Sequence, residues 1–218
     1  MKKSIYLSSL LGLMLVGANA QATLAPGPVD WIDWTSSTEG TLDIGGTLVG
    51  VTMTSDVPVG YIDGDHYFNN ANTVATNTYA GLAPEDLIQV NWANSFTLNF
   101  DQTLSDLYMA LVSVGQPGYA VNYTFEDGFS VISEGSNFWG AGSYGIVGTT
   151  FTGREFNGIL EFDGSFDSIS FTVGPRENWH GFNFGSASLA RVPEPAVSVL
   201  FGFGLFSLMM LARRRKTV

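Results

Sequence analysis

Residues 98–109 read LNFDQTLSDLYM, and residues 160–171 read LEFDGSFDSISF. In both segments apolar and polar residues alternate on either side of an aspartate, a pattern typical of two half-buried strands joined by a turn. We expect Asp101 and Asp163 to accept backbone N–H bonds in these turns, with Leu104 and Phe166 packed beneath them. Such corners suit a chain that crosses between two sheets. The alternative is that the likeness reflects common strand and turn chemistry.

The same period-two pattern extends through the rest of the chain between its two ends. β-Branched and aromatic residues alternate with polar ones, glycine-rich turns recur at short spacing, and helical periodicity is almost absent. The prediction is an all-β fold, a β-sandwich of jelly-roll type, with an up-and-down barrel as the alternative. The strands are expected over residues 47–54, 88–92, 96–100, 107–114, 120–125, 129–133, 149–152, 158–162, 169–173 and 181–189.

Three segments have little strand pattern. Residues 26–46 and 63–83 are rich in Asp, Asn, Thr and Gly, and we expect surface loops or irregular edges there. Residues 135–148 place aromatic side chains among glycine and serine, which predicts a flexible aromatic loop of the kind that often contacts ligands.

The N-terminus has the three regions of a secretory signal peptide. Lys2 and Lys3 precede an apolar stretch over residues 5–16, and Ala18 and Ala20 form a small-x-small cleavage site. The apolar stretch is too short to span a bilayer of roughly 30 Å. We therefore expect signal peptidase to remove residues 1–20 after the secretion machinery exports the chain; the alternative is an uncleaved anchor.

The C-terminus predicts one transmembrane helix over residues 196–212. These 17 residues carry no charge, and a helix of that length spans about 25 Å, near the lower limit for crossing. The cations that follow, Arg213, Arg214, Arg215 and Lys216, are expected to stop transfer and stay in the cytoplasm. The preceding domain would then lie outside the cytoplasm, as the signal peptide also predicts.

Pro193, Glu194 and Pro195 stand immediately before this apolar segment. The order of Val-Pro-Glu-Pro, short glycine-bearing apolar helix and arginine cluster resembles the PEP-CTERM sorting signal, here covering residues 191–218. The resemblance implies that an exosortase in the inner membrane recognises the three residues, cleaves nearby and passes the protein to the cell surface or extracellular matrix. A role linked to exopolysaccharide or biofilm would follow.

Composition bounds the domain between the two ends, residues 21–190. From residue 21 to residue 192 there are 19 acidic and 3 basic residues, so this part carries 3 − 19 = −16. Such a charge repels phosphate backbones and excludes nucleic acid as a partner. The chain has no cysteine, which excludes disulfides, thiolate metal sites and cysteine nucleophiles. The length suits one domain with a sizeable core.

No catalytic residues are expected, and we predict that the chain is not an enzyme. The carboxylates Glu126, Asp127, Glu155 and Glu161 cannot be placed in a facing pair from sequence. His66 and His180 belong to no catalytic or zinc motif. No cofactor is implied.

A calcium site is the one metal hypothesis that the sequence supports. Asp63 and Asp65, followed by Asn69, Asn70 and Asn72, could supply several hard oxygen ligands from one loop. The order of an EF-hand is missing. The alternative is an Asx-rich turn that satisfies its own backbone.

Two of the five tryptophans are candidates for contact with a glycan. Trp139 and Trp179 lie in polar, glycine-containing stretches, and an exposed indole can stack on the C–H face of a sugar. Packing in the core is the alternative for each of them. The leading hypothesis is a structural or interaction protein of the surface or exopolysaccharide matrix. The others are a carbohydrate-binding module, with or without calcium, and a secreted hydrolase on a jelly-roll frame.

Overall fold

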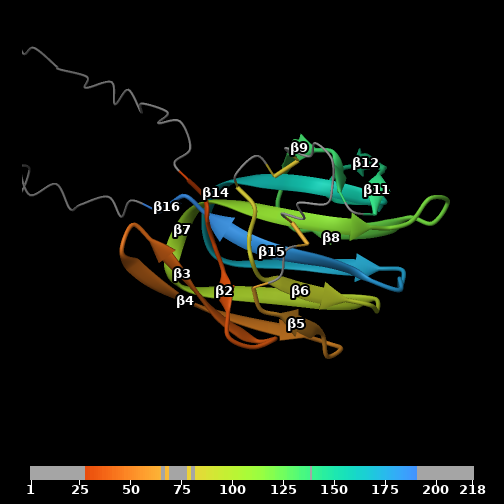
Figure 1. The fold of residues 1–218 in the computed structure, drawn as a ribbon. Coiled ribbons are helices and arrows are strands. Elements are labelled where there is room, and N and C mark those ends of the chain that lie inside the picture. The colour runs from red at the N-terminus through yellow and green to blue at the C-terminus, as the bar shows by residue number, and fades with distance from the viewer. Residues whose placement is uncertain (1–27, 65–66, 69–77, 80–81, 138, 191–218) are drawn as a thin grey trace, which may run out of the picture.

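The computed structural model describes residues 28–64, 67–68, 78–79, 82–137 and 139–190 (Figure 1). In these ranges the chain is all-β, without a helix, and most strands join one antiparallel sheet. The strands are β1 Asp30–Trp31, β2 Asp33–Trp34, β3 Glu39–Ile44, β4 Thr47–Ser55, β5 Gly60–Ile62, β6 Leu87–Val90, β7 Asn94–Val114, β8 Val121–Phe125, β9 Ser130–Glu134, β10 Ser136–Asn137, β11 Gly140–Ala141, β12 Ser143–Val147, β13 Thr150–Arg154, β14 Phe156–Gly174, β15 His180–Ser186 and β16 Ser188–Leu189.

The two long strands β7 and β14 pair with each other along their whole length and organise the sheet. Their halves have different outer neighbours. The first half of β7 pairs with β4, and the second half of β7 pairs with β15. The first half of β14 pairs with β9, and the second half of β14 pairs with β8. Each long strand therefore belongs to two separate groups of strands.

Both long strands bend sharply near their middles, so that the two halves of each strand face each other. β14 has 19 residues and would extend about 60 Å if straight, yet the residues just outside its two ends, Glu155 and Glu177, line one cavity. Register shifts between Phe162 and Ser165 and between Phe166 and Ser168 mark the bend. At the same place β16 pairs with Ser105 and Leu104 of β7, so the described chain ends beside the bend.

The core lies between the two groups of strands. Phe171 of β14 stacks on Phe96 of β7 with ring centroids 5.0 Å apart, and it meets Phe182 and Phe184 of β15 at 5.4 and 5.7 Å. Rings from one half of the folded sheet thus pack against rings from the other half. This arrangement is consistent with a β-sandwich, and within the described residues no pairing joins the outer strands β12 and β5 of the main path into a closed cylinder.

The repeated segments at residues 98–109 and 160–171 are antiparallel partners, with Leu104 opposite Phe166. The expected turn after Asp101 and Asp163 is wrong, because both strands continue through it as a bend with bulges. The carboxylate that binds the backbone here is instead Asp106, whose Oδ1 accepts the N–H of Gly164 at 2.9 Å. Leu104 and Phe166 are buried, as expected.

Two segments expected to be loops contain strands. Within residues 26–46, β3 pairs with β4 and buries Leu42 and Ile44. Within residues 135–148, β12 pairs with β13, and the pair β10–β11 forms a separate small hairpin. Gly40, Leu42 and Ile44 do alternate with Thr41 and Asp43, but the glycine at the first of these positions weakens the apolar pattern. Each segment expected to be a strand between residues 47 and 189 overlaps an observed strand. However, 96–100 and 107–114 are both parts of β7, 158–162 and 169–173 are both parts of β14, and 181–189 is divided between β15 and β16.

Candidate functional site

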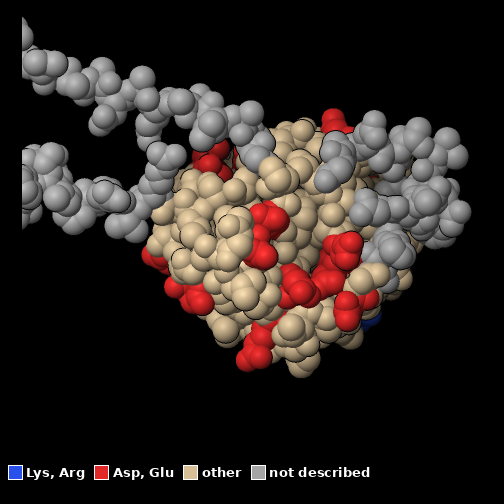
Figure 2. Space-filling model, turned by 60° about the vertical axis from the view of Figure 1, so that its left-hand side comes forward, with Lys and Arg blue, Asp and Glu red and all other residues tan. Residues whose placement is uncertain are grey.

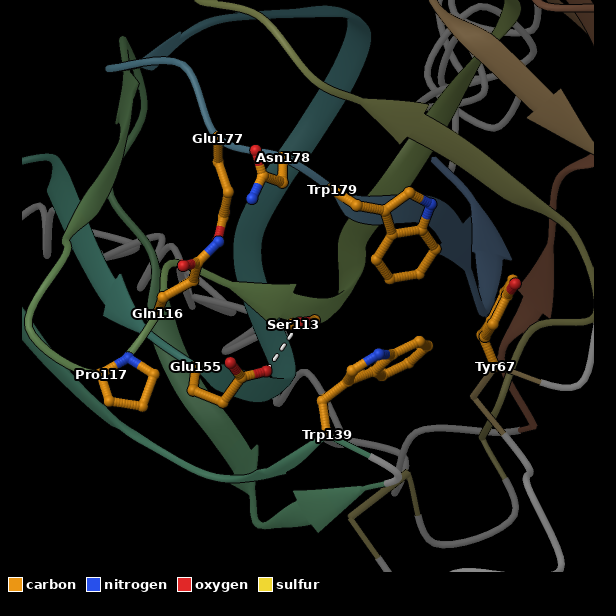
Figure 3. Close-up of a pocket in the computed structure, with 9 residues that line it drawn as sticks. All are labelled: Tyr67, Ser113, Gln116, Pro117, Trp139, Glu155, Glu177, Asn178 and Trp179. Carbon is orange, nitrogen blue, oxygen red and sulfur yellow. Dashed lines mark hydrogen bonds between the residues drawn. The ribbon is translucent and has the colours of Figure 1, made fainter.

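One pocket is lined by residues from several loops at the ends of strands (Figure 3). Its cavity measures about 460 Å³. The lining residues come from the segment before β6, the end of β7, the β10–β11 connection and the two loops that flank β14. They are Tyr67, Ser113, Gln116, Pro117, Trp139, Glu155, Glu177, Asn178 and Trp179.

Three aromatic side chains, Tyr67, Trp139 and Trp179, form what we call the aromatic wall. The ring centroids of Trp139 and Trp179 lie 4.7 Å apart, and those of Tyr67 lie 5.1 and 4.8 Å from them. All three side chains are half-buried. Figure 3 shows the wall on one side of the pocket, with the acidic residues opposite. The wall gives the cavity an apolar side opposite its polar residues.

The fold explains how the wall residues meet. Trp179 immediately precedes β15, whose first residue, His180, is buried and pairs with Val90 of β6. Trp139 lies in the short connection between β10 and β11, where the positive φ of Gly140 (121°) closes the hairpin. Ladders of hydrogen bonds thus fix both backbones close to the wall.

Glu155 and Ser113 form the first polar contact in the pocket. The Ser113 hydroxyl donates to Glu155 Oε1 at 2.6 Å, and the Ser113 N–H donates to the Asn157 side chain at 2.8 Å. Both Ser113 and Glu155 have positive φ angles, 54° and 58°. Such backbone costs of order 1–3 kcal/mol per residue when it is not glycine, and it concentrates at functional sites.

Glu177 is the second acid of the pocket, and its side chain is only 1 % exposed. Its Oε2 accepts the N–H of Gly115 at 2.8 Å and lies 3.0 Å from His180 Nδ1. The His180 contact is close but lacks the alignment of a hydrogen bond, and among the described residues Glu177 Oε1 has no hydrogen-bond partner. A buried carboxylate oxygen without a donor is unfavourable.

Burial raises the pKa of the Glu155 carboxyl, and the charge of Glu177 raises it further, against the opposing effect of the hydrogen bond from Ser113. The pKa of Glu155 therefore lies above its ordinary value. We call Glu155 and Glu177 the acid pair.

The structure brings together Trp139 and Trp179, the two residues proposed for glycan contact, and adds Tyr67 to them. It also places Glu155 in the pocket with Glu177, whereas sequence reasoning named Glu155 only as one of several scattered carboxylates and missed Glu177. The segment Glu177-Asn-Trp-His180 held a usable signal, an acid, a tryptophan and a histidine within four residues.

The other tryptophans have different surroundings. The ring of Trp34 is buried, and its Nε1 donates to the Asn183 side chain at 2.9 Å. Trp92 is 50 % exposed and lies beneath the guanidinium of Arg176. Trp92 is not among the residues that line the pocket.

The calcium hypothesis finds no ligand cluster in the described part of the chain. Asp63 is exposed, and Asp65, Asn69, Asn70 and Asn72 lie outside the described residues. The acid beside this loop is Asp86, whose two oxygens accept the backbone N–H groups of Trp34 and Gly64 at 2.7 and 2.8 Å. Burial raises the pKa of Asp86, and the charges of Asp33 and Asp63 contribute to this rise.

Acidic side chains are spread over the face drawn in Figure 2, with almost no basic ones among them. This surface accords with the charge of −16 counted above for residues 21–192.

Searches against known families, curated proteins and solved structures give no match for this chain. Several predicted residues lie outside the described ranges: the cleavage site Ala18 and Ala20, the motif Pro193, Glu194 and Pro195, the cations Arg213, Arg214, Arg215 and Lys216, and His66. The helix expected over residues 196–212 lies outside them too. Across the ranges that the structure describes, none of the segments is a helix with the length and apolar character needed to span a bilayer.

Proposed function

We propose that this chain is an exported protein of the cell surface or extracellular matrix whose jelly-roll β-sandwich domain binds carbohydrate in the pocket of Tyr67, Trp139 and Trp179. The observation that carries the proposal is the aromatic wall beside a cavity of about 460 Å³. A pyranose ring has an apolar C–H face and a polar rim. The wall can take the face, and Ser113, Gln116, Asn178 and the acid pair can bind the rim.

Replacing Trp139 or Trp179 with alanine is expected to weaken glycan binding roughly 10–100-fold, because each change removes about 1.5–3 kcal/mol of apolar contact. The measurement is a glycan array followed by calorimetry on the best ligand, with and without a chelator. Trp92→Ala is the matched control, since Trp92 is an exposed tryptophan away from the pocket. Equal losses in all three variants, or no glycan bound by the parent, would contradict the proposal.

A secreted hydrolase is the second candidate, and it is favoured by the acid pair in the pocket. Glycoside hydrolysis uses two carboxylates, of which the acid has a raised pKa, and Glu155 has that property. Mass spectrometry of the bound oligosaccharide after long incubation separates the two functions. Shorter products that form with the parent protein but not with Glu155→Gln would show that the domain is a hydrolase. An oligosaccharide that stays intact would support binding without catalysis.

Export and sorting form the other part of the proposal and rest on the two ends of the chain. A signal peptide over residues 1–20 and a tail with Pro193, Glu194 and Pro195 would direct the chain through the inner membrane to an exosortase. In a host that lacks the exosortase, the full-length protein is expected to accumulate in the inner membrane. Fractionation and immunoblotting check this, and unchanged delivery to the surface would refute the sorting role.

A further inference from the structure

The residues that line the pocket indicate which class of carbohydrate it would bind. Two of the nine lining residues, Glu155 and Glu177, are acidic, and none of the nine is basic. An arginine adjoins each of the two acids in sequence. Arg176, next to Glu177, has its guanidinium over the ring of Trp92, 4.1 Å from the centroid. Arg154 is exposed. The lining therefore offers two carboxylates and no Lys or Arg, and the one basic side chain shown against them is His180, 3.0 Å from Glu177 Oε2.

Glu177 gives independent evidence that the pocket lacks a donor. Its side chain is 1 % exposed, and Oε2 is held by the Gly115 N–H at 2.8 Å. The other carboxylate oxygen of Glu177, Oε1, is also buried and has no hydrogen-bond partner among the described residues. A buried charged oxygen gains most from a donor that is itself charged, because such hydrogen bonds are shorter and stronger than neutral ones.

The backbone that positions the acid pair adopts unfavourable conformations, at a cost in stability. Ser113 and Glu155 both adopt left-handed backbone conformations and bind each other through a 2.6 Å hydrogen bond. Gly115 has a φ of 77°, and a Cβ atom there would lie 2.3 Å from the carbonyl oxygen of Gly153. Only glycine can place its N–H against Glu177 in this way.

The aromatic wall also favours a ligand that carries a positive charge. The faces of tryptophan and tyrosine rings attract cations within about 6 Å of their centroids. They also stack on the C–H faces of sugars. A ligand that combines an apolar sugar face with an ammonium group would use the wall and the acid pair together.

We propose that the pocket is specific for an amine-bearing sugar, such as a hexosamine without its acetyl group, whose ammonium group binds between Glu155 and Glu177 while its apolar face packs against the aromatic wall. This inference rests on the carbohydrate-binding function proposed above. An N-acetyl group would remove the charge and leave the acid pair without its cationic partner.

The test is calorimetry on the purified full-length protein with three oligosaccharides of equal length: β-1,4-linked glucosamine, its N-acetylated form and the corresponding glucose oligomer. The glucosamine form is expected to bind at least about tenfold more tightly than the other two, because it alone forms charge-assisted hydrogen bonds. Glu155→Gln keeps the size of the side chain and an acceptor for Ser113, and it is expected to remove most of that preference. Glu126→Gln removes one exposed negative charge away from the pocket and is expected to leave the preference unchanged.

Because the whole domain is acidic, attraction of any polycation needs its own control. An oligolysine of the same charge is expected to bind weakly and to be unaffected by Trp139→Ala, whereas glucosamine binding is lost in that variant. Tight binding of all three sugars without preference would overturn this inference and leave the carbohydrate proposal standing. Binding of none of them alongside hits on the glycan array would also overturn the inference alone; no binding anywhere would refute both.

Discussion

Replacing Phe171 with alanine is expected to lower the free energy of unfolding by about 3–5 kcal/mol, the usual cost of removing a buried phenylalanine. Phe171 lies at the centre of the core, where its ring meets those of Phe96, Phe182 and Phe184 from both groups of strands. The substitution therefore opens a cavity between the two halves of the folded sheet. Denaturant unfolding followed by tryptophan fluorescence measures the change.

Two variants test whether position in the core causes this loss. Phe171→Leu keeps most of the volume and is expected to cost clearly less than alanine. Tyr144→Ala removes a ring from the edge strand β12, where the side chain is 36 % exposed, and is expected to cost little. If Phe171→Ala and Tyr144→Ala were equally destabilising, the proposed centre of the core would be wrong.

The second large effect is expected at Asn183, a fully buried side chain in β15. Its Oδ1 accepts from Trp34 Nε1 at 2.9 Å, and its Nδ2 donates to the carbonyls of Ile32 and Asp86 at 2.9 and 3.1 Å. Asn183→Ala would leave these groups buried without a partner, at about 1–3 kcal/mol for each group. We expect a total loss of about 3 kcal/mol or more, measured by denaturant unfolding.

A double-mutant cycle isolates the contribution of the indole. Trp34→Phe removes the Nε1 donor, so the costs of Trp34→Phe and Asn183→Ala should not add if the hydrogen bond joins them. Asn122→Ala is the control, because Asn122 in β8 is only half-buried and bonds the Thr152 hydroxyl. Full additivity in the cycle would mean that the Trp34 contact does not carry the effect.

The sequence predicted the strands well wherever alternation was clean. Phe96, Leu98 and Phe100 point into the core while Thr97 and Asn99 do not, which is the expected consequence of the two-residue period. Strand β3 was missed because its apolar side is built from Gly40, Leu42 and Ile44, and a glycine adds no hydrophobic signal. The bend in β7 and β14 was expected as a turn, since sequence cannot tell a bulged strand from an interrupted one.

The candidate site was predicted in part. Trp139 and Trp179 were chosen because they lie in polar, glycine-containing stretches, and the structure brings their rings together. The local segment around Glu177 held a signal, but the contact of Glu177 with the backbone of Gly115, 62 residues away in the chain, could not be predicted from it. Distances of that kind are set by the register of β7 against β14, and a local pattern does not contain them.

The position of the bend has a consequence for how the domain would stand on a membrane. The described chain leaves the sheet at Leu189, which pairs with Leu104 at the bend, whereas Trp179 immediately precedes β15 at the opposite end. If the proposed sorting tail anchors the chain after residue 190, the bend would lie nearer the lipid surface than the pocket does. The mouth of the pocket would face outward, toward polymers in the surrounding medium.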